Sequence, residues 1–220
     1  MFKLHSMKRS AVVFGASGLV GKTLLKELFH DSSYEKVIAV VRKELPLRNE
    51  KFEQVIMTSF ANLADHKRKL PATDYFCCIG TTIKKAGSQK AFRDVDHGIP
   101  VKIAMFAEEL TVPNMVVVSS IGASALSRNF YLRTKGEMEE AVRKIYTGNL
   151  TFVRPSLLMG DREEPRFGER MAVGMMKSFG WMFAGPLKKY RGIPAETVVR
   201  SMIKAAQYPG NLYLESDKLL

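Results

Sequence analysis

The chain has 220 residues, of which 46% are hydrophobic, and this length and composition suit one globular domain with a substantial core. No apolar run approaches the roughly 18 residues of a membrane span, and the first stretch, MFKLHSMKRS, lacks the apolar region of a signal peptide. The net charge is +12 with scattered Lys and Arg residues, which favours a basic surface attracting a polyanionic cofactor over a nucleic-acid interface.

The two cysteines, Cys77 and Cys78, are adjacent. In a strand they would point to opposite faces and could not form a disulfide with each other. We therefore expect a reduced, cytoplasmic protein. The four histidines are dispersed without the spacing of metal ligands, and no metal site is predicted.

The first predicted elements are a strand over residues 11–14, a glycine turn and a helix over residues 19–30. They lie in and around the stretch VVFGASGLVGK. Gly15 would allow a sharp turn, Gly18 would let backbone N–H groups approach a pyrophosphate, and Gly21 would let the helix pack closely on the strand. The helix N-terminus then offers free N–H groups to phosphates. Ordinary turn glycines are the alternative.

The second predicted strand, residues 37–41, ends at Arg42 and Lys43, about 20 positions past Gly21. A site that prefers NAD has Asp or Glu there, to hold the ribose 2′-hydroxyl. Two basic residues suit a 2′-phosphate instead, which predicts NADP(H) as the cofactor. The alternative is that both residues open a solvated loop.

The alternation continues with a strand over 54–57, a polar helix over 62–69 and a strand over 75–79, closed by Gly80 and Thr81. Ligands of such sheets sit beyond the carboxyl ends of the strands. Gly80 and Thr81 are therefore candidates to face the adenosine half of the cofactor, with a plain turn as the alternative. A basic loop over 84–90 and a helix over 95–109, broken near its start by Pro100, come next.

A strand over 115–119, a helix over 131–145 and a strand over 150–153 complete six alternations, which predict an α/β fold with a doubly wound parallel sheet. A charged loop over 160–169, a Met-rich segment over 171–183, a helix over 195–207 and a last strand over 212–214 follow. We expect a single domain, with residues 1–155 as the dinucleotide-binding core. Residues 156–220 would form a small lobe over the carboxyl edge of the sheet, where a substrate would sit.

The candidate catalytic residues follow the fifth strand. Tyr131 and Lys135 are four positions apart on a predicted helix, so they share one face. A nearby ammonium lowers the pKa of a Tyr hydroxyl from about 10, which makes Tyr131 a usable proton donor or acceptor. A hydroxyl of Ser119 or Ser120 could hold the reacting oxygen, and Lys135 could also bond the nicotinamide ribose. A surface pair without function is the alternative.

The glycine turn and the motifs FCCIGTT, DVD, VVVSSIGAS, FYLRTKGEMEE, FVRPSLLMGDREEPRFGE and IPAETVVRSM together resemble the atypical short-chain dehydrogenase/reductases, in their Tat-interacting oxidoreductase-like branch. The likeness runs from about residue 12 to residue 205. It implies a Rossmann fold that binds NADP(H), with Tyr131 as proton acceptor and donor, Lys135 as its partner and Ser120 as oxygen holder, Ser119 being a close substitute. The cofactor contacts that it implies are Gly15, Ser17, Gly18, Leu19, Val20, Gly21, Lys22, Arg42, Lys43, Ile79, Gly80, Thr81, Tyr131, Lys135, Leu158 and Arg166.

One position departs from the family pattern. Many relatives with a full catalytic tetrad carry an Asn ahead of the active site, where this chain reads Asp94-Val95-Asp96. The resemblance therefore does not imply the full proton relay.

Two hypotheses of different classes follow. The first is an NADP(H)-dependent oxidoreductase for a small carbonyl or alcohol, and the second is an NADPH-binding regulatory protein with little or no turnover. A nucleotide-sugar epimerase with retained NAD is a third, which Arg42 and Lys43 disfavour. The expected partner is a small-molecule substrate, with no nucleic acid and no membrane, and a protein partner or a homodimer is left open.

Overall fold

The computed structural model describes residues 8–159, 192–208, 210 and 212–219. Their centre is a seven-stranded sheet in the order β3-β2-β1-β4-β5-β6-β9, in which every neighbouring pair is parallel. This order is that of a doubly wound nucleotide-binding sheet with one strand added beside β6, and it confirms the predicted fold class. The strands are β1 (Arg9–Phe14), β2 (Tyr34–Val41), β3 (Phe52–Ile56), β4 (Asp74–Cys77), β5 (Asn114–Val118), β6 (Asn149–Arg154) and β9 (Tyr213–Glu215).

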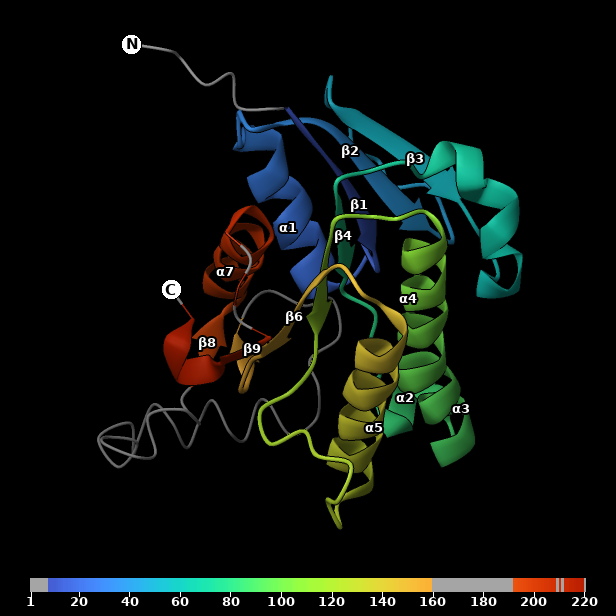
Figure 1. The fold of residues 1–220 in the computed structure, drawn as a ribbon, viewed down its shortest axis with the longest axis vertical. Helices are drawn as coiled ribbons and strands as arrows, with labels where there is room; N and C mark the ends of the chain where they lie inside the picture. Colours follow the sequence, from blue (N-terminus) through green and yellow to red (C-terminus); the bar gives the residue numbers. More distant parts are fainter. Residues whose placement is uncertain (1–7, 160–191, 209, 211, 220) are drawn as a thin grey trace.

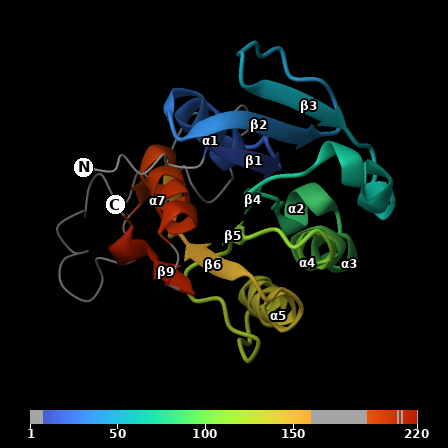
Figure 2. The same ribbon diagram turned by 45° about the horizontal axis from the view of Figure 1, so that its top comes forward.

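Helices cover both faces of the sheet (Figures 1 and 2). One face carries α1 (Leu19–His30) and α7 (Ala195–Gln207), and the other carries α4 (Ile99–Glu109) and α5 (Phe130–Ile145). Side chains alternate along β1, so Val13 packs under α1 and α7 while Val12 and Phe14 pack on the opposite side. Both faces are therefore buried, which explains why the central strands are continuous apolar runs.

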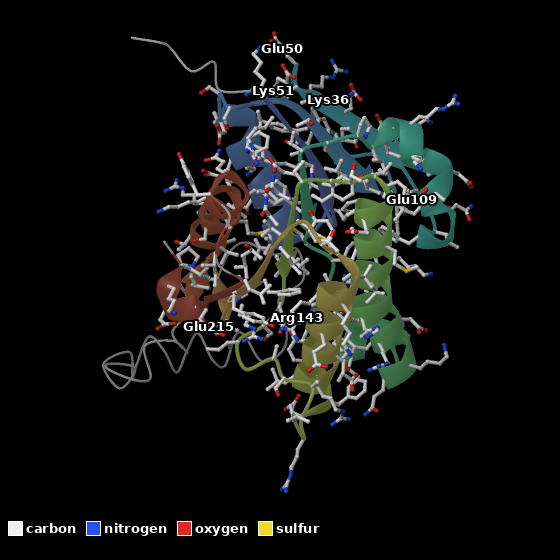
Figure 3. All side chains as sticks on the ribbon, in the orientation of Figure 1. Lys36, Glu50, Lys51, Glu109, Arg143 and Glu215 are labelled. Carbon is white, nitrogen blue, oxygen red and sulfur yellow. The ribbon has the colours of Figure 1, made fainter. Side chains whose placement is uncertain are left out.

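Figure 3 labels residues near the amino and the carboxyl ends of the parallel strands. Lys36, near the start of β2, and Lys51, just before β3, lie at one end of the molecule, and Glu215, the last residue of β9, lies toward the other. Because all seven strands are parallel, their carboxyl ends meet at the edge marked by Glu215. The turns after β1, β2, β4 and β5 therefore gather there, where ligands of such sheets bind.

Several strands begin earlier than the hydrophobic pattern predicts, because their first residues are polar and pair across the sheet. Arg9 Nε donates to Asp74 Oδ2 at 2.8 Å, and Asn114 Nδ2 donates to Asp74 Oδ1 at 2.8 Å. Asn149 Nδ2 then donates to Asn114 Oδ1 at 3.0 Å. This polar row joins the amino ends of β1, β4, β5 and β6, where a search for apolar residues stops short.

The segment between β4 and β5 differs most from the prediction. The expected basic loop over 84–90 contains two short helices, α2 (Ile83–Ala86) and α3 (Gln89–Arg93), which Thr82 and Ser88 cap through their hydroxyls. The expected helix over 95–109 is not broken at Pro100. It begins with a π-helical turn, η2 (Asp94–Gly98), and continues as α4 with Pro100 in its first turn. The polar helix expected over 62–69 is the 3-10 helix η1 (Phe60–Lys69).

The described carboxyl-terminal residues join the layers of the main sheet. Strand β9 pairs in parallel with β6, and α7 packs against α1, with the bounds predicted for that helix. Residues Leu158–Met159 (β7) and Ile193–Pro194 (β8) form a separate two-stranded pair. Helix α7 and strand β9 therefore belong to the layers of the main sheet, whereas the sequence predicts a separate lobe over residues 156–220. The charged loop at 160–169 and the Met-rich segment at 171–183 lie outside the described residues.

None of the helices in the described ranges combines the length and the apolar character needed to cross a bilayer.

Candidate functional site

The glycine turn after β1 has the geometry that its sequence predicts. Gly15 has a φ of +81°, and a Cβ placed on it would lie 2.8 Å from the backbone carbonyl of Cys78. A Cβ on Gly21 would overlap the carbonyl oxygen of Gly15. Both positions therefore require glycine, the first for its left-handed backbone and the second for the close approach of α1 to the turn.

The first turn of α1 faces the carboxyl edge with its backbone donors. Its N-cap is Gly18, which has no side chain to accept from those N–H groups, and the first turn carries no acidic residue. No residue of this turn therefore compensates the partial positive charge of the helix, as an anion site requires. Ser17, Gly18 and Lys22 are exposed and Leu19 is half-buried, while Val20 and Gly21 are buried. Val20 and Gly21 could therefore offer a ligand only their backbone.

The basic pair after β2 stands beside this turn. β2 neighbours β1, with Val40 opposite Phe14, so Arg42 and Lys43 follow β2 at the same edge at which the glycine turn follows β1. Both side chains are exposed, and neither forms an ion pair with another described residue. Their charges are available to an anionic ligand.

The loop after β4 lies next to the turn as well. Cys78 N–H donates to the carbonyl of Phe14 at 2.8 Å, which continues the pairing of β4 with β1. Ile79 and Thr81 are half-buried and Gly80 is exposed. Thr81 N–H donates to Asp96 Oδ2 at 2.8 Å, so a side chain of η2 holds this loop.

Tyr131 and Lys135 lie one turn apart on α5, as predicted, but the partner of the lysine is a residue that was not predicted. Lys135 Nζ lies 2.8 Å from Asp96 Oδ1, and the two side chains are 3% and 1% exposed. The structure records no hydrogen bond between Lys135 and the Tyr131 hydroxyl. Tyr131 is half-buried, and its ring packs on that of Phe92 with 5.6 Å between centroids.

The ion pair determines the charge of Lys135. Burial by itself lowers the pKa of this ammonium, but attraction by Asp96, followed by smaller contributions from Tyr131 and Cys77, outweighs it and raises the pKa above its ordinary value. Burial raises the pKa of the Cys77 thiol to about 11. At neutral pH the lysine is therefore charged and the thiol beside it is neutral.

The two serines differ in their surroundings. Ser119 is buried and donates its N–H to Val153 at 2.8 Å, and its Oγ has no hydrogen-bond partner among the described residues. Ser120 is half-buried, and its Oγ makes a long contact of 3.4 Å to the carbonyl of Ile121. Neither hydroxyl is strongly engaged. The assignment of the oxygen-holding role to Ser120, with Ser119 as substitute, stays a prediction.

The remaining predicted contacts lie past β6. Leu158 is half-buried in β7 and packs against the core under α1 and α7. Arg166 lies outside the described residues.

Asp96 is the residue of this site that sequence reasoning missed. Its only signal was the DVD stretch standing where many relatives have Asn, and the pattern does not say that the carboxylate faces a lysine 39 positions later. The arrangement offers groups that can move a proton, because a phenol, an ammonium and a weakly engaged hydroxyl all follow β5, on α5 and in the loop before it.

Comparisons with known proteins agree with this geometry. A family model described as NAD(P)H-binding matches residues 15–174. Protein HTATIP2 of Rattus norvegicus is 34% identical over 217 residues, covering 97% of this chain and 87% of that protein. The mitochondrial protein FMP52 of Debaryomyces hansenii is 29% identical over 204 residues, covering 91% and 88%.

Two solved structures share the fold. MoeE5 in complex with UDP-glucose and NAD superposes with a TM-score of 0.69 at 16% identity, over 93% of this chain and 74% of that one. A short chain dehydrogenase family protein from Francisella tularensis has a TM-score of 0.66 at 13% identity, over 96% and 98%.

The expectation of a cytoplasmic location is wrong by these comparisons, because several relatives are FMP52 proteins named as mitochondrial. The expectation rested on Cys77 and Cys78, which are free thiols in the structure. Free thiols indicate a reducing environment and do not identify the compartment.

Proposed function

This chain belongs to the NAD(P)H-binding family, as its motifs predict, and from that premise we propose that it is an NADP(H)-dependent oxidoreductase of short-chain dehydrogenase type. Its substrate would be a small carbonyl compound or the corresponding alcohol. The observation that carries the proposal is that Tyr131 and Lys135 lie one turn apart on α5, with Lys135 buried and charged beside the loop that follows β4.

The residues at the carboxyl edge fit a dinucleotide. The uncapped first turn of α1, beside a turn in which Gly15 and Gly21 leave no room for a side chain, suits a pyrophosphate. Arg42 and Lys43 suit a 2′-phosphate, the first through its planar fork of donors and the second as a point charge. When bound, the nicotinamide supplies or accepts the hydride.

The chain's own residues divide the remaining work. The Tyr131 hydroxyl would give a proton to the carbonyl oxygen or take it from the alcohol, and Ser120 or Ser119 would hold that oxygen by a hydrogen bond. Lys135 would present a fixed positive charge near Tyr131 and donate to the nicotinamide ribose. The ring of Phe92 supports the orientation of the Tyr131 ring.

Replacing Tyr131 with Phe tests the proposal. We expect turnover with NADPH to fall by at least about a hundredfold, as for loss of a general acid, and NADPH affinity to stay near that of wild type. The measurement is NADPH absorbance with a broad panel of carbonyl substrates, together with a fluorescence titration of NADPH. Tyr208→Phe is the matched control, because Tyr208 is an exposed phenol that follows α7. Equal activity in wild type and Tyr131→Phe would contradict the catalytic role.

A second candidate function is an NADPH-binding regulatory protein with little or no turnover. The contact that favours it is the engagement of Lys135 with Asp96, with no recorded hydrogen bond to Tyr131. Tight NADPH binding combined with no absorbance change across the whole carbonyl panel would select this function over the first.

A further inference from the structure

Asp96 and Lys135 form a buried contact between two elements that are far apart in the sequence. Asp96 lies in the π-helical turn η2 and Lys135 lies in α5, and their charged atoms are 2.8 Å apart. Withdrawing two such charges from water is costly, and their attraction offsets the cost only with good geometry and further hydrogen bonds.

The second oxygen of Asp96 supplies one of those further bonds. Asp96 Oδ2 accepts from the N–H of Thr81 at 2.8 Å, while Oδ1 faces Lys135. The pair also lies directly beside Gly80, because a Cβ on that glycine would be 3.4 Å from Asp96 Oδ1 and 3.8 Å from Lys135 Nζ. One carboxylate therefore connects the loop after β4 with the predicted catalytic face of α5.

The other groups that face Lys135 cannot replace this carboxylate. Tyr131 on α5 and Cys77 on β4 are the remaining titratable groups that act on it within the described residues. The thiol is neutral at physiological pH because burial raises its pKa. Without Asp96, the buried ammonium would be left with no carboxylate partner among the residues that the structure describes.

We propose that Asp96 is a positioning residue for the cofactor: it keeps Lys135 charged and fixed at the nicotinamide ribose, and it holds the Gly80–Thr81 loop at the adenosine half. The inference rests on the proposed binding of NADPH. If the ion pair were purely structural, its loss would affect the folding of the protein. The protein that still folds would then bind NADPH and its adenosine fragment with unchanged affinity, or with equally reduced affinity for both.

The test separates the two halves of the cofactor. Wild type, Asp96→Asn and Asp96→Ala are titrated with NADPH and with adenosine 2′,5′-bisphosphate, which lacks the nicotinamide ribose. Asn keeps an oxygen for the Thr81 N–H and loses only the charge. We expect Asp96→Asn to weaken NADPH binding at least about tenfold, because one charge-assisted hydrogen bond is lost. The affinity of this variant for the bisphosphate should stay within about twofold of the wild-type value. Asp96→Ala weakens both ligands.

Asp94→Asn is the matched control. Asp94 is also an acidic residue of η2, but it is exposed and pairs with Lys90 at 2.9 Å. Its replacement should leave the affinity for both ligands unchanged.

A double-variant cycle completes the experiment and covers the case in which Asp96→Asn does not fold. Lys135→Met carrying Asp96→Asn removes both charges, and it should bind NADPH as Lys135→Met alone does, since Asp96 acts through Lys135. A further loss of NADPH affinity in the double variant, relative to Lys135→Met alone, overturns the inference. The inference is also overturned if Asp96→Asn weakens the binding of NADPH and of the bisphosphate equally, or weakens neither. Failure of wild type to bind NADPH refutes the proposed function itself.

Discussion

At the scale of single residues, we expect the exposed side chain of Arg42 to have a large effect on cofactor choice. It follows β2 at the edge of the glycine turn and has no acidic partner among the described residues. A 2′-phosphate carries close to two negative charges, and charge-assisted hydrogen bonds contribute about 1.5–3 kcal/mol each. We expect solvent screening at an open edge to reduce this to about 2 kcal/mol, or roughly thirtyfold in favour of NADPH over NADH.

Substitution of Arg42 should change this preference in a graded way. Arg42→Ala should weaken the binding of NADPH several-fold and leave the binding of NADH almost unchanged. Arg42→Asp should reverse the preference, because a carboxylate repels the 2′-phosphate of NADPH and accepts a hydrogen bond from the free 2′-hydroxyl of NADH. Fluorescence titration of each variant with NADPH and with NADH measures the two affinities and their ratio. Arg48→Ala, another exposed arginine of the same loop, serves as the control. Equal binding of NADH and NADPH by wild type would mean that Arg42 and Lys43 only open a solvated loop.

At the scale of elements, the contact of α1 with the glycine turn is a close packing constraint on the site. A Cβ on Gly21 would overlap the carbonyl oxygen of Gly15 and the Cα of Ala16, both backbone atoms that cannot turn aside. Gly21→Ala should therefore push α1 away from β1. We expect a loss of about 1–3 kcal/mol in the free energy of unfolding and weaker NADPH binding, because the helix N-terminus moves with the helix.

Chemical denaturation and a NADPH titration measure the two effects. Gly98→Ala is the control, since its Cβ would meet only the Arg93 carbonyl oxygen, at 3.9 Å. Unchanged NADPH affinity in a folded Gly21→Ala would show that the position of α1 does not govern the cofactor site.

The elements also show what a sequence can and cannot predict. The helix over 19–30 was predicted at its bounds because its apolar face recurs every three or four residues and a glycine precedes it. Strand starts such as Arg9 and Asn114 were missed because the partner of each polar residue lies on another strand. The contact of Asp96 with Lys135 depends on the π-helical turn η2, which precedes Pro100. Pro100 has no N–H to donate to the carbonyl four residues before it, and this local backbone geometry is not evident from the sequence pattern.

At the scale of the whole molecule, the buried pair makes stability depend on pH in a way that can be derived. In wild type the pKa of Lys135 is raised above its unfolded value of about 10.4. Its stabilising contribution is therefore fully present below that pH and is lost as the pH rises through the folded pKa. Between pH 7 and about pH 9, wild-type Lys135 is charged in both the folded and the unfolded state, and it adds almost no pH dependence.

We expect Asp96→Asn to reverse the sign of this shift. Burial lowers the pKa of Lys135, and without the carboxylate only Tyr131 and Cys77 oppose that effect. The folded pKa of Lys135 in Asp96→Asn should then lie below the unfolded value. The unfolded state would bind more protons in the window between the two pKa values, and the free energy of unfolding would rise with pH. The deficit of Asp96→Asn relative to wild type should be about 3–5 kcal/mol near pH 7, as for a broken buried pair, and should narrow toward pH 10. Thermal or chemical unfolding of both proteins across this pH range measures the difference in their free energies of unfolding. Groups that titrate in the same way in both proteins cancel from this difference. Asp94→Asn should show almost no gap at any pH, because its carboxylate is exposed, whereas a gap for Asp96→Asn that stays constant from pH 7 to pH 10 would mean that Lys135 does not depend on Asp96 for its charge.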